Sequence, residues 1–121
     1  MEIKKLEINI SICKVAEPSA IDFNQEFCFV GKTDEELSLV CPTENVPELT
    51  LERNDGWKAF RIQGILDFSL IGILAKIAGL LAENGISIFA VSTFNTDYVL
   101  TKAEHYPRAL EVLENAGYRM I

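Results

Sequence analysis

The chain has 121 residues, 49% of them apolar, and carries 18 acidic against 11 basic side chains, a net charge of −7. That length fits one compact domain or two very small ones sharing a core, and the composition excludes a disordered chain. The acidic balance argues against a nucleic-acid partner, because binding phosphates requires clustered lysine and arginine.

The first half of the chain is predicted to be rich in strands and poor in helix. Residues 6–13 alternate apolar and polar side chains, the period-two pattern of a strand with one buried face. The elements expected after it are a loop or one-turn helix at 16–24, strands at 26–31 and 37–41, and a proline-bounded break at 42–47. The polar run 52–56 is the best boundary candidate, so we expect domains at 1–56 and 57–121.

Residues 57–121 are predicted to follow the order β-α-β-β-α-β, the ferredoxin-like α+β arrangement. The expected elements are a strand ending at Gly64, a helix from Leu70 capped by Ser69 or Asp67 and stopped at Asn84-Gly85, strands at 86–91 and 98–102, a helix begun by Pro107 and stopped at Gly117, and a short strand at 118–121. The first half reads as a shorter, helix-poor version of the same unit. Unpaired strand edges predict that two such units pack together, within one chain or between chains.

The cysteines and the N-terminus indicate a reducing, cytoplasmic location. Cys13, Cys28 and Cys41 are widely spaced and sit in apolar runs, which predicts free, buried thiols. Residues 1–5 lead into an alternating pattern, so no signal peptide is expected. The longest apolar stretch, 70–82, contains a lysine and is too short to cross a bilayer.

Signatures of catalysis, metal binding and cofactor binding are not found in the sequence, which predicts a protein that is not an enzyme. Residues 29–33 resemble the end of a phosphate-binding loop, but Glu26 replaces its first glycine and its charge would repel phosphate. The single histidine, His105, leaves no room for a Cys/His metal site or a histidine-based triad. We therefore expect no catalytic residue, no metal and no cofactor.

Two segments contain residues that neither core packing nor turn formation fully explains. The segment 64–72 links a strand to a helix and places Gly72 in the expected first turn, where free backbone N–H groups favour a carboxylate. The segment 92–97 gathers small hydrogen-bonding side chains and Asp97 at a hairpin. One interpretation is a site for a zwitterion, with helix amides at its carboxylate and Asp97 at its ammonium. The alternative is a well-capped helix followed by a polar hairpin.

The same segments carry a family resemblance. Residues 64–75 and 86–100 resemble small proteins with tandem ACT repeats, and so does the motif Thr33-x-Glu35-Glu36-Leu37-Ser38-Leu39-Val40. The chain is also similar to the repeats of the animal cytosolic arginine sensors. The resemblance implies a ferredoxin-like ACT domain with a shorter, degenerate ACT-like N-terminal repeat.

ACT domains bind amino acids at an interface between domains, so the resemblance also implies a ligand site. The residues expected to contact the ligand are Asp67, Phe68, Ser69, Leu70, Gly72, Ile73, Ser92, Thr93, Asn95 and Asp97. We expect an amino-acid-binding regulator that forms a homodimer or docks on a partner enzyme or regulator, away from membranes, and signals by shifting between domain arrangements. The alternative is a structural, oligomerising scaffold without a ligand.

Overall fold

The computed structural model describes residues 1–63 and 72–121, and its contacts divide the chain into two units. Unit 1 comprises Met1–Glu7 and Lys58–Ile121, and unit 2 comprises Ile8–Trp57. The break between residues 57 and 58 lies one residue from the boundary expected from the sequence. Residues 1–7, however, group with the C-terminal unit and not with the N-terminal one.

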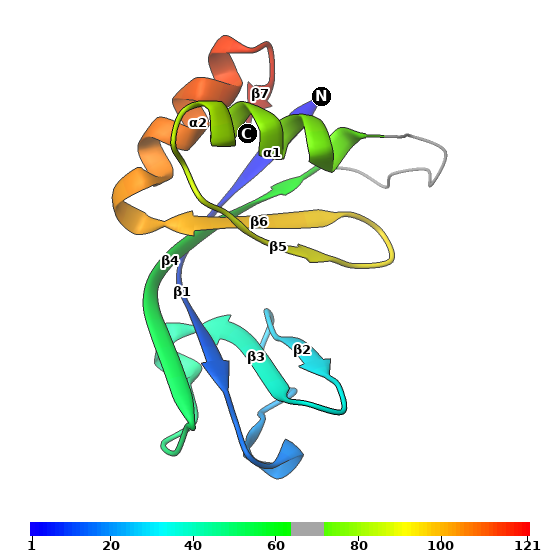
Figure 1. The fold of residues 1–121 in the computed structure, drawn as a ribbon, viewed down its shortest axis with the longest axis vertical. Coiled ribbons are helices and arrows are strands. Elements are labelled where there is room, and N and C mark those ends of the chain that lie inside the picture. Colours follow the sequence, from blue (N-terminus) through cyan, green and yellow to red (C-terminus); the bar gives the residue numbers. More distant parts are fainter. Residues whose placement is uncertain (64–71) are drawn as a thin grey trace. The chain divides into compact units, whose positions relative to one another are not determined.

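Unit 1 has the expected α+β, ferredoxin-like order of elements (Figure 1). Its elements are the end of β4 (Glu52–Ile62), α1 (Ile73–Glu83), β5 (Phe89–Ser92), β6 (Asp97–Lys102), the 3₁₀ turn η3 (Ala103–His105), α2 (Tyr106–Asn115) and β7 (Arg119–Met120). The prediction of β-α-β-β-α-β for this half of the chain is confirmed. Strand β5 begins three residues later than the apolar run at 86–91 indicated.

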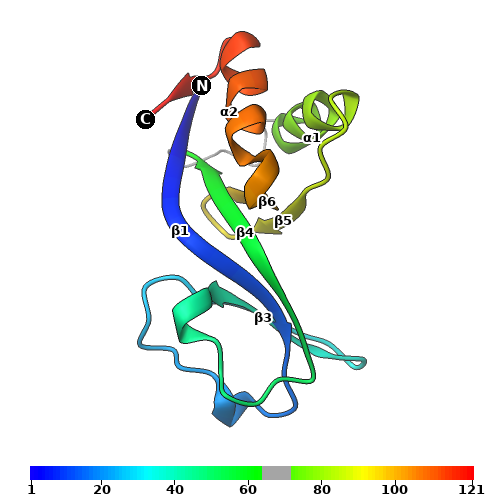
Figure 2. The ribbon, with the colours of Figure 1, turned by 90° about the vertical axis from the view of Figure 1, so that its left-hand side faces the viewer.

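A strand from the N-terminus completes the sheet of unit 1. Strand β1 (Glu2–Lys14) is hydrogen-bonded to β4 on one side, and its first residues pair in parallel with β7 on the other. Gln63 donates its N–H to the carbonyl of Glu2 at 2.9 Å, and Ile121 donates to Ile3 at 2.9 Å. Figure 2 shows β1 and β4 side by side. The strand order in unit 1 is therefore β7-β1-β4-β6-β5.

The core of unit 1 lies between this sheet and the two helices, which cover one face of it (Figure 1). Its members are Ile3, Phe60, Ile62, Ile77, Leu81, Ile86, Val99, Tyr106, Ala109 and Leu113. Because strand side chains alternate, residues next to Phe60 and Val99 in the chain point to the opposite face. The buried hydroxyl of Tyr106 donates to the carbonyl oxygen of Ala59 at 2.6 Å, and burial raises the pKa of Tyr106 to about 12.

The polar run 52–56, where the sequence predicts a domain boundary, forms the first half of β4 and ends two residues before the division between the two units at residue 58. Its charged side chains bind one another and a neighbouring strand. Asp55 accepts a hydrogen bond from the buried Ser11 at 2.6 Å and forms an ion pair with Arg53 at 2.8 Å. Gly56 has a φ of 85°, a conformation that favours glycine and occurs at irregular strand positions. The polar composition of 52–56 fits an exposed stretch of strand.

Unit 2 is built mainly of strands. Besides parts of β1 and β4, it contains the 3₁₀ turn η1 (Pro18–Ala20), β2 (Phe29–Lys32), β3 (Leu37–Pro42) and the 3₁₀ turn η2 (Thr43–Asn45). Strand β3 pairs antiparallel with β1 and β2, and its buried residues Leu39 and Cys41 pack with Cys13 and Val15. Within residues 8–57, all of which the structure describes, no α-helix is formed. The expected helix-poor first half is therefore confirmed.

A hairpin and the turn that follows it recur with an offset of 60 residues, which supports an internal repeat. Strand β2 (29–32) corresponds to β5 (89–92), β3 (37–42) to β6 (97–102), and η2 (43–45) to η3 (103–105). Both hairpin loops close in the same way, since Thr33 donates its N–H to Glu36 at 2.9 Å and Thr93 donates to Thr96 at 2.8 Å. After η3 the chain forms α2, whereas after η2 it forms no α-helix. The N-terminal repeat is thus a degenerate, ACT-like unit.

The thiols gather in unit 2. Cys13 and Cys41 are buried as expected, but Cys28 is only half-buried, because it precedes β2 at the margin of the small core. Burial raises the pKa of each thiol, and that of Cys41 to about 12. A raised pKa lowers the fraction of reactive thiolate at neutral pH.

Thiol labelling checks this arrangement. With a chromogenic disulfide reagent near pH 8, Cys28 is expected to react first, while Cys13 and Cys41 react slowly until the protein unfolds, because access and thiolate formation are both limited by burial. Mass spectrometry of partially labelled protein identifies the sites. Rapid reaction of Cys13 and Cys41 in the native protein would contradict the core of unit 2.

Candidate functional site

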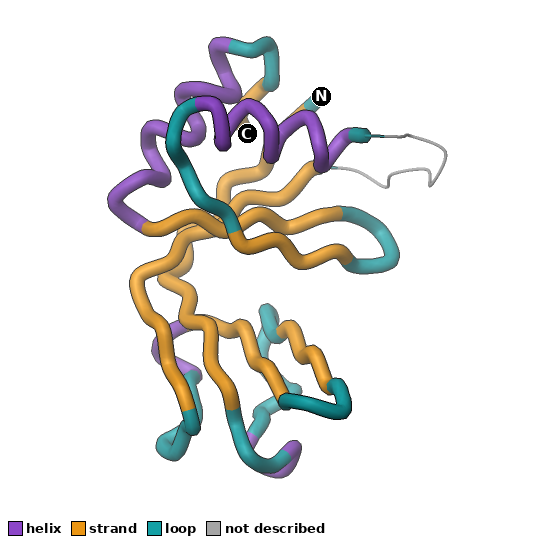
Figure 3. The backbone as a smooth tube through the Cα atoms, in the orientation of Figure 1, coloured by secondary structure: helices purple, strands orange, loops and turns teal. Residues whose placement is uncertain are grey.

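The hairpin β5–β6 carries four of the residues predicted from the sequence to contact a ligand, and Figure 3 shows the loop joining its strands. Ser92 and Asp97 are register partners, and the hydroxyl of Ser92 donates to a carboxylate oxygen of Asp97 at 2.5 Å. Thr93 donates its hydroxyl to the carbonyl of Thr96 at 3.0 Å. The hairpin thus holds the Asp97 side chain by a hydrogen bond while leaving it partly exposed.

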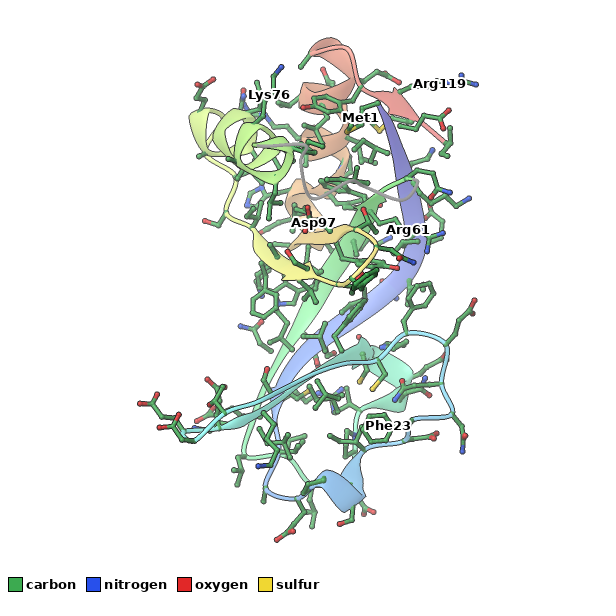
Figure 4. All side chains as sticks on the ribbon, turned by 90° about the vertical axis from the view of Figure 1, so that its right-hand side faces the viewer. Met1, Phe23, Arg61, Lys76, Asp97 and Arg119 are labelled. Atoms are coloured by element: carbon green, nitrogen blue, oxygen red, sulfur yellow. The ribbon has the colours of Figure 1, made fainter. Side chains whose placement is uncertain are left out.

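Asp97 faces the helices. It lies two residues before Val99, which is fully buried in the core beneath the helices, so strand alternation places both side chains on that face. Figure 4 shows Asp97 on β6, in the same unit as Lys76 on α1. A carboxylate on the helix face of the sheet is suited to receive an ammonium group that approaches from the start of α1.

Gly72 marks the start of α1. Helix α1 begins at Ile73, because Gly72 adopts a φ of 80°, outside helical geometry, and occupies the N-cap position; the expected start at Leu70 lies outside the described residues. No side chain caps the helix among the described residues. The predicted caps, Asp67 and Ser69, lie outside the part of the chain that the structure describes.

A hollow of about 380 Å³ opens at this helix end. Its lining residues are Met1, Gly72, Ile73, Lys76, Ala116, Gly117 and Tyr118. The partial positive charge of a helix N-terminus and the ammonium of Lys76 act in the same direction, so the hollow favours an anionic group such as a carboxylate. Figure 4 labels Met1, which directly precedes β1, and Lys76, which lies on α1.

The described residues do not bring the predicted site into one cavity. Gly72 and Ile73 line the hollow at α1, whereas Thr93 and Asn95 line a second hollow of about 350 Å³ beside β4. Ser92 and Asp97 belong to the lining of neither. The predicted contacts Asp67, Phe68, Ser69 and Leu70 lie outside the described residues, so the segment linking β4 to α1 stays a prediction.

Sequence reasoning missed several residues that line these hollows. Lys76, four residues after Gly72, is the one charged side chain between residues 73 and 82, a signal that could have been used. Met1 joins the hollow through the pairing of β1 with β7, which no local pattern indicates. Arg61 and Tyr98 line the second hollow, and their alternation with core residues was a usable signal.

Other kinds of site find little support in the described residues. No group of three or more potential ligands among residues 1–63 and 72–121 is arranged to hold a metal ion. No helix in the same ranges is long and apolar enough to cross a membrane. What the described part offers is an anion-favouring hollow and a nearby carboxylate on the same face of one sheet.

Sequence comparisons agree with this fold. A family model described as ACT domain matches residues 52–115. The protein named cytosolic arginine sensor for mTORC1 subunit 1 from Homo sapiens is 35% identical over 105 residues, covering 81% of this chain and 31% of that protein. The chain thus spans less than a third of the length of this curated relative.

Structural comparisons give the same architecture over nearly the whole chain. A crystal structure from Agobacterium tumefaciens is 31% identical with a TM-score of 0.87, covering 99% of this chain and 91% of that one. The ligand-free regulatory subunit of aspartate kinase from Thermus thermophilus has a TM-score of 0.68 at 13% identity, covering 97% and 98%. At that identity the second match shows the shared fold alone.

Proposed function

Because this chain belongs to the ACT-domain family, we propose that it is a regulatory protein that binds an amino acid and transmits that state to a partner. Its similarity to an arginine sensor and its fold, shared with a regulatory subunit of aspartate kinase, support amino-acid sensing as the general role. We further propose that it is not an enzyme, that it acts in the cytosol, and that it works as a homodimer or docked on a partner enzyme or regulator.

The observation that carries the proposal is that unit 1 has, on the helix side of its sheet, one group of residues that favours an anion and one side chain that favours a cation. The start of α1, with Lys76, favours a carboxylate, while Asp97 offers a fixed negative charge to an ammonium. A free amino acid is the small molecule that presents both groups. The proposed contacts are Asp67, Phe68, Ser69, Leu70, Gly72, Ile73, Ser92, Thr93, Asn95 and Asp97.

The second candidate, a scaffold without a ligand, has one observation in its favour. The Asp97 carboxylate already accepts a hydrogen bond from Ser92, so it has a partner within the hairpin without a bound ammonium. Equilibrium dialysis of the full chain against pooled amino acids separates the two functions. A sensor retains one or a few amino acids, whereas a scaffold retains none.

Substitution of Asp97 tests its proposed role once a ligand is known. Asp97→Asn is expected to weaken amino-acid binding about ten- to a hundredfold, because a charge-assisted contact is lost. Stability without ligand is expected to change by less than about 0.5 kcal/mol, since an amide oxygen can still accept from Ser92. Calorimetric titration gives the affinity, and chemical unfolding gives the stability.

The matched control is Asp34→Asn. It removes the same charge from the exposed hairpin loop of unit 2, so it reports the effect of net charge alone and should leave affinity within about twofold. Equal weakening by both substitutions would point to general electrostatics. A large loss of stability with unchanged affinity would make Asp97 a structural turn residue.

A further inference from the structure

Arg61 has an unusual environment for a surface arginine. It lies on β4 between Phe60 and Ile62, both fully buried in the core beneath the helices, so its side chain projects from the opposite face of the sheet. Its side chain is half-buried and is labelled in Figure 4. Removing part of a guanidinium from water is unfavourable unless polar or charged partners replace the water.

The residues that the structure describes supply only part of that replacement. Nε of Arg61 donates to Oε1 of Gln63 at 3.2 Å, and Nη1 donates to the hydroxyl of Tyr98 at a long 3.4 Å. A guanidinium has five N–H groups, so three remain without a partner among residues 1–63 and 72–121. These remaining donors belong to the Nη atoms, which form one side of the fork used to bind oxyanions.

No carboxylate neutralises Arg61 within the described chain. The ion pairs found among those residues involve Arg53, His105 and Arg119, and none involves Arg61. Asp97 stands on the neighbouring strand β6, but it points toward the helices while Arg61 points away from them.

The arginine borders the hollow of about 350 Å³ described above, all of it within unit 1. The described residues that line it are Arg61, Ile62, Gln63, Thr93, Asn95, Thr96 and Tyr98, and none of these seven is acidic. One wall is fixed, because the buried hydroxyl of Thr96 donates to the carbonyl of Ile62 at 2.6 Å and ties the hairpin loop to the end of β4. Gln63 and Asn95 add side-chain amides to the rim.

We propose that this hollow binds a small oxyanion, a carboxylate or a phosphate group, through the free side of the Arg61 guanidinium. Two parallel N–H···O contacts to such a group would satisfy donors that the described residues leave without a partner and would neutralise the charge. The hydroxyl of Tyr98 and the amide of Asn95 are placed to contact its remaining oxygens. The site shares Thr93 and Asn95 with the proposed amino-acid site but uses neither Asp97 nor α1, so it does not rest on that proposal.

Titration of the full chain with two probes tests the site and separates its two possible ligand sources. Inorganic phosphate and succinate are added at constant ionic strength, and binding is followed by calorimetry and by the NMR signal of the Arg61 Nε–H group. Binding of either probe is expected to shift that signal. The probe with the higher affinity identifies phosphate or carboxylate as the natural chemistry.

Three variants make the result specific. Arg61→Gln is expected to weaken the preferred probe about ten- to a hundredfold, and Arg61→Lys by a smaller factor, because lysine keeps the charge but loses the fork. Arg119→Gln is the control, since it removes the same charge from a side chain that is 77% exposed and pairs with Glu2. It should leave the affinity within about twofold, as expected for a distant, screened charge.

Several outcomes would overturn the proposal. One is an Arg61 signal that moves with neither probe at about 10 mM, where even a millimolar site would be mostly occupied. Another is equal weakening by Arg61→Gln and Arg119→Gln, which would show non-specific attraction. If Arg61→Gln fails to fold, the wild-type NMR titration and the Arg61→Lys affinity still decide the question.

Discussion

Removing residues 1–7 is expected to abolish cooperative folding of unit 1. These residues supply the strand between β4 and β7, and Ile3 within it is fully buried in the core. The deletion leaves the N–H groups of Gln63, Arg119 and Ile121 without their acceptors, the carbonyls of residues 1–3. Several lost hydrogen bonds at about 1 kcal/mol each, together with about 2–5 kcal/mol for the cavity, rival the whole stability of a small domain.

Far-UV circular dichroism and thermal unfolding of the shortened chain measure this effect. The control is the full chain with Lys5→Ala and Glu7→Ala, which changes exposed positions of the same strand and keeps its backbone. The control should unfold in one cooperative transition, whereas the shortened chain should show none for unit 1. A cooperative transition in the shortened chain would mean that β4 and β7 can pair directly.

Phe60→Ala is expected to destabilise the protein by about 3–5 kcal/mol, the usual cost of truncating a buried aromatic side chain. Phe60 is the largest of the fully buried side chains among residues 1–63 and 72–121 and lies in the core beneath the two helices. The loss combines transfer of apolar surface with a cavity that the surrounding helices and strands fill only in part. Urea unfolding followed by circular dichroism gives the change in the free energy of unfolding.

Two controls frame that measurement. Phe60→Leu keeps most of the apolar volume and should cost less than half as much as Phe60→Ala. Phe23→Ala changes a side chain that is 68% exposed, labelled in Figure 4, and should shift stability by less than about 0.5 kcal/mol. Similar effects of Phe60→Ala and Phe23→Ala would contradict the assigned core.

Much of the fold was predictable because its signals are local. Three patterns each determine the secondary structure of the residues immediately around them: the alternation at 6–13, the apolar positions of α1 and the proline in the first turn of α2. The place of β1 between β4 and β7 was not predictable, because it depends on pairing between the two ends of the chain. The sequence also did not predict that the polar run 52–56 forms part of a strand, since solvent-facing strand residues and boundary segments share the same composition.

The candidate site was predictable in part for the same reason. The Ser92–Asp97 segment was recognised from its cluster of polar side chains, and the structure adds the hydrogen bond that fixes the carboxylate. The hollow at α1 was not foreseen in full, because Met1 and Gly117 reach it only through tertiary packing. The position of Gly72 as an N-cap depends on its positive φ, which composition alone does not reveal.

The 60-residue offset between the two hairpins has a consequence for stoichiometry. The positions of Ser92 and Asp97 in one hairpin are occupied by Lys32 and Leu37 in the other, and Leu37 is buried in the core of unit 2. The two hairpins therefore differ at these positions: the one in unit 1 has a hydroxyl–carboxylate pair, and the one in unit 2 has a leucine that packs into the core. A ligand that requires that pair finds one copy per chain, so a symmetric dimer would hold two such molecules and not four.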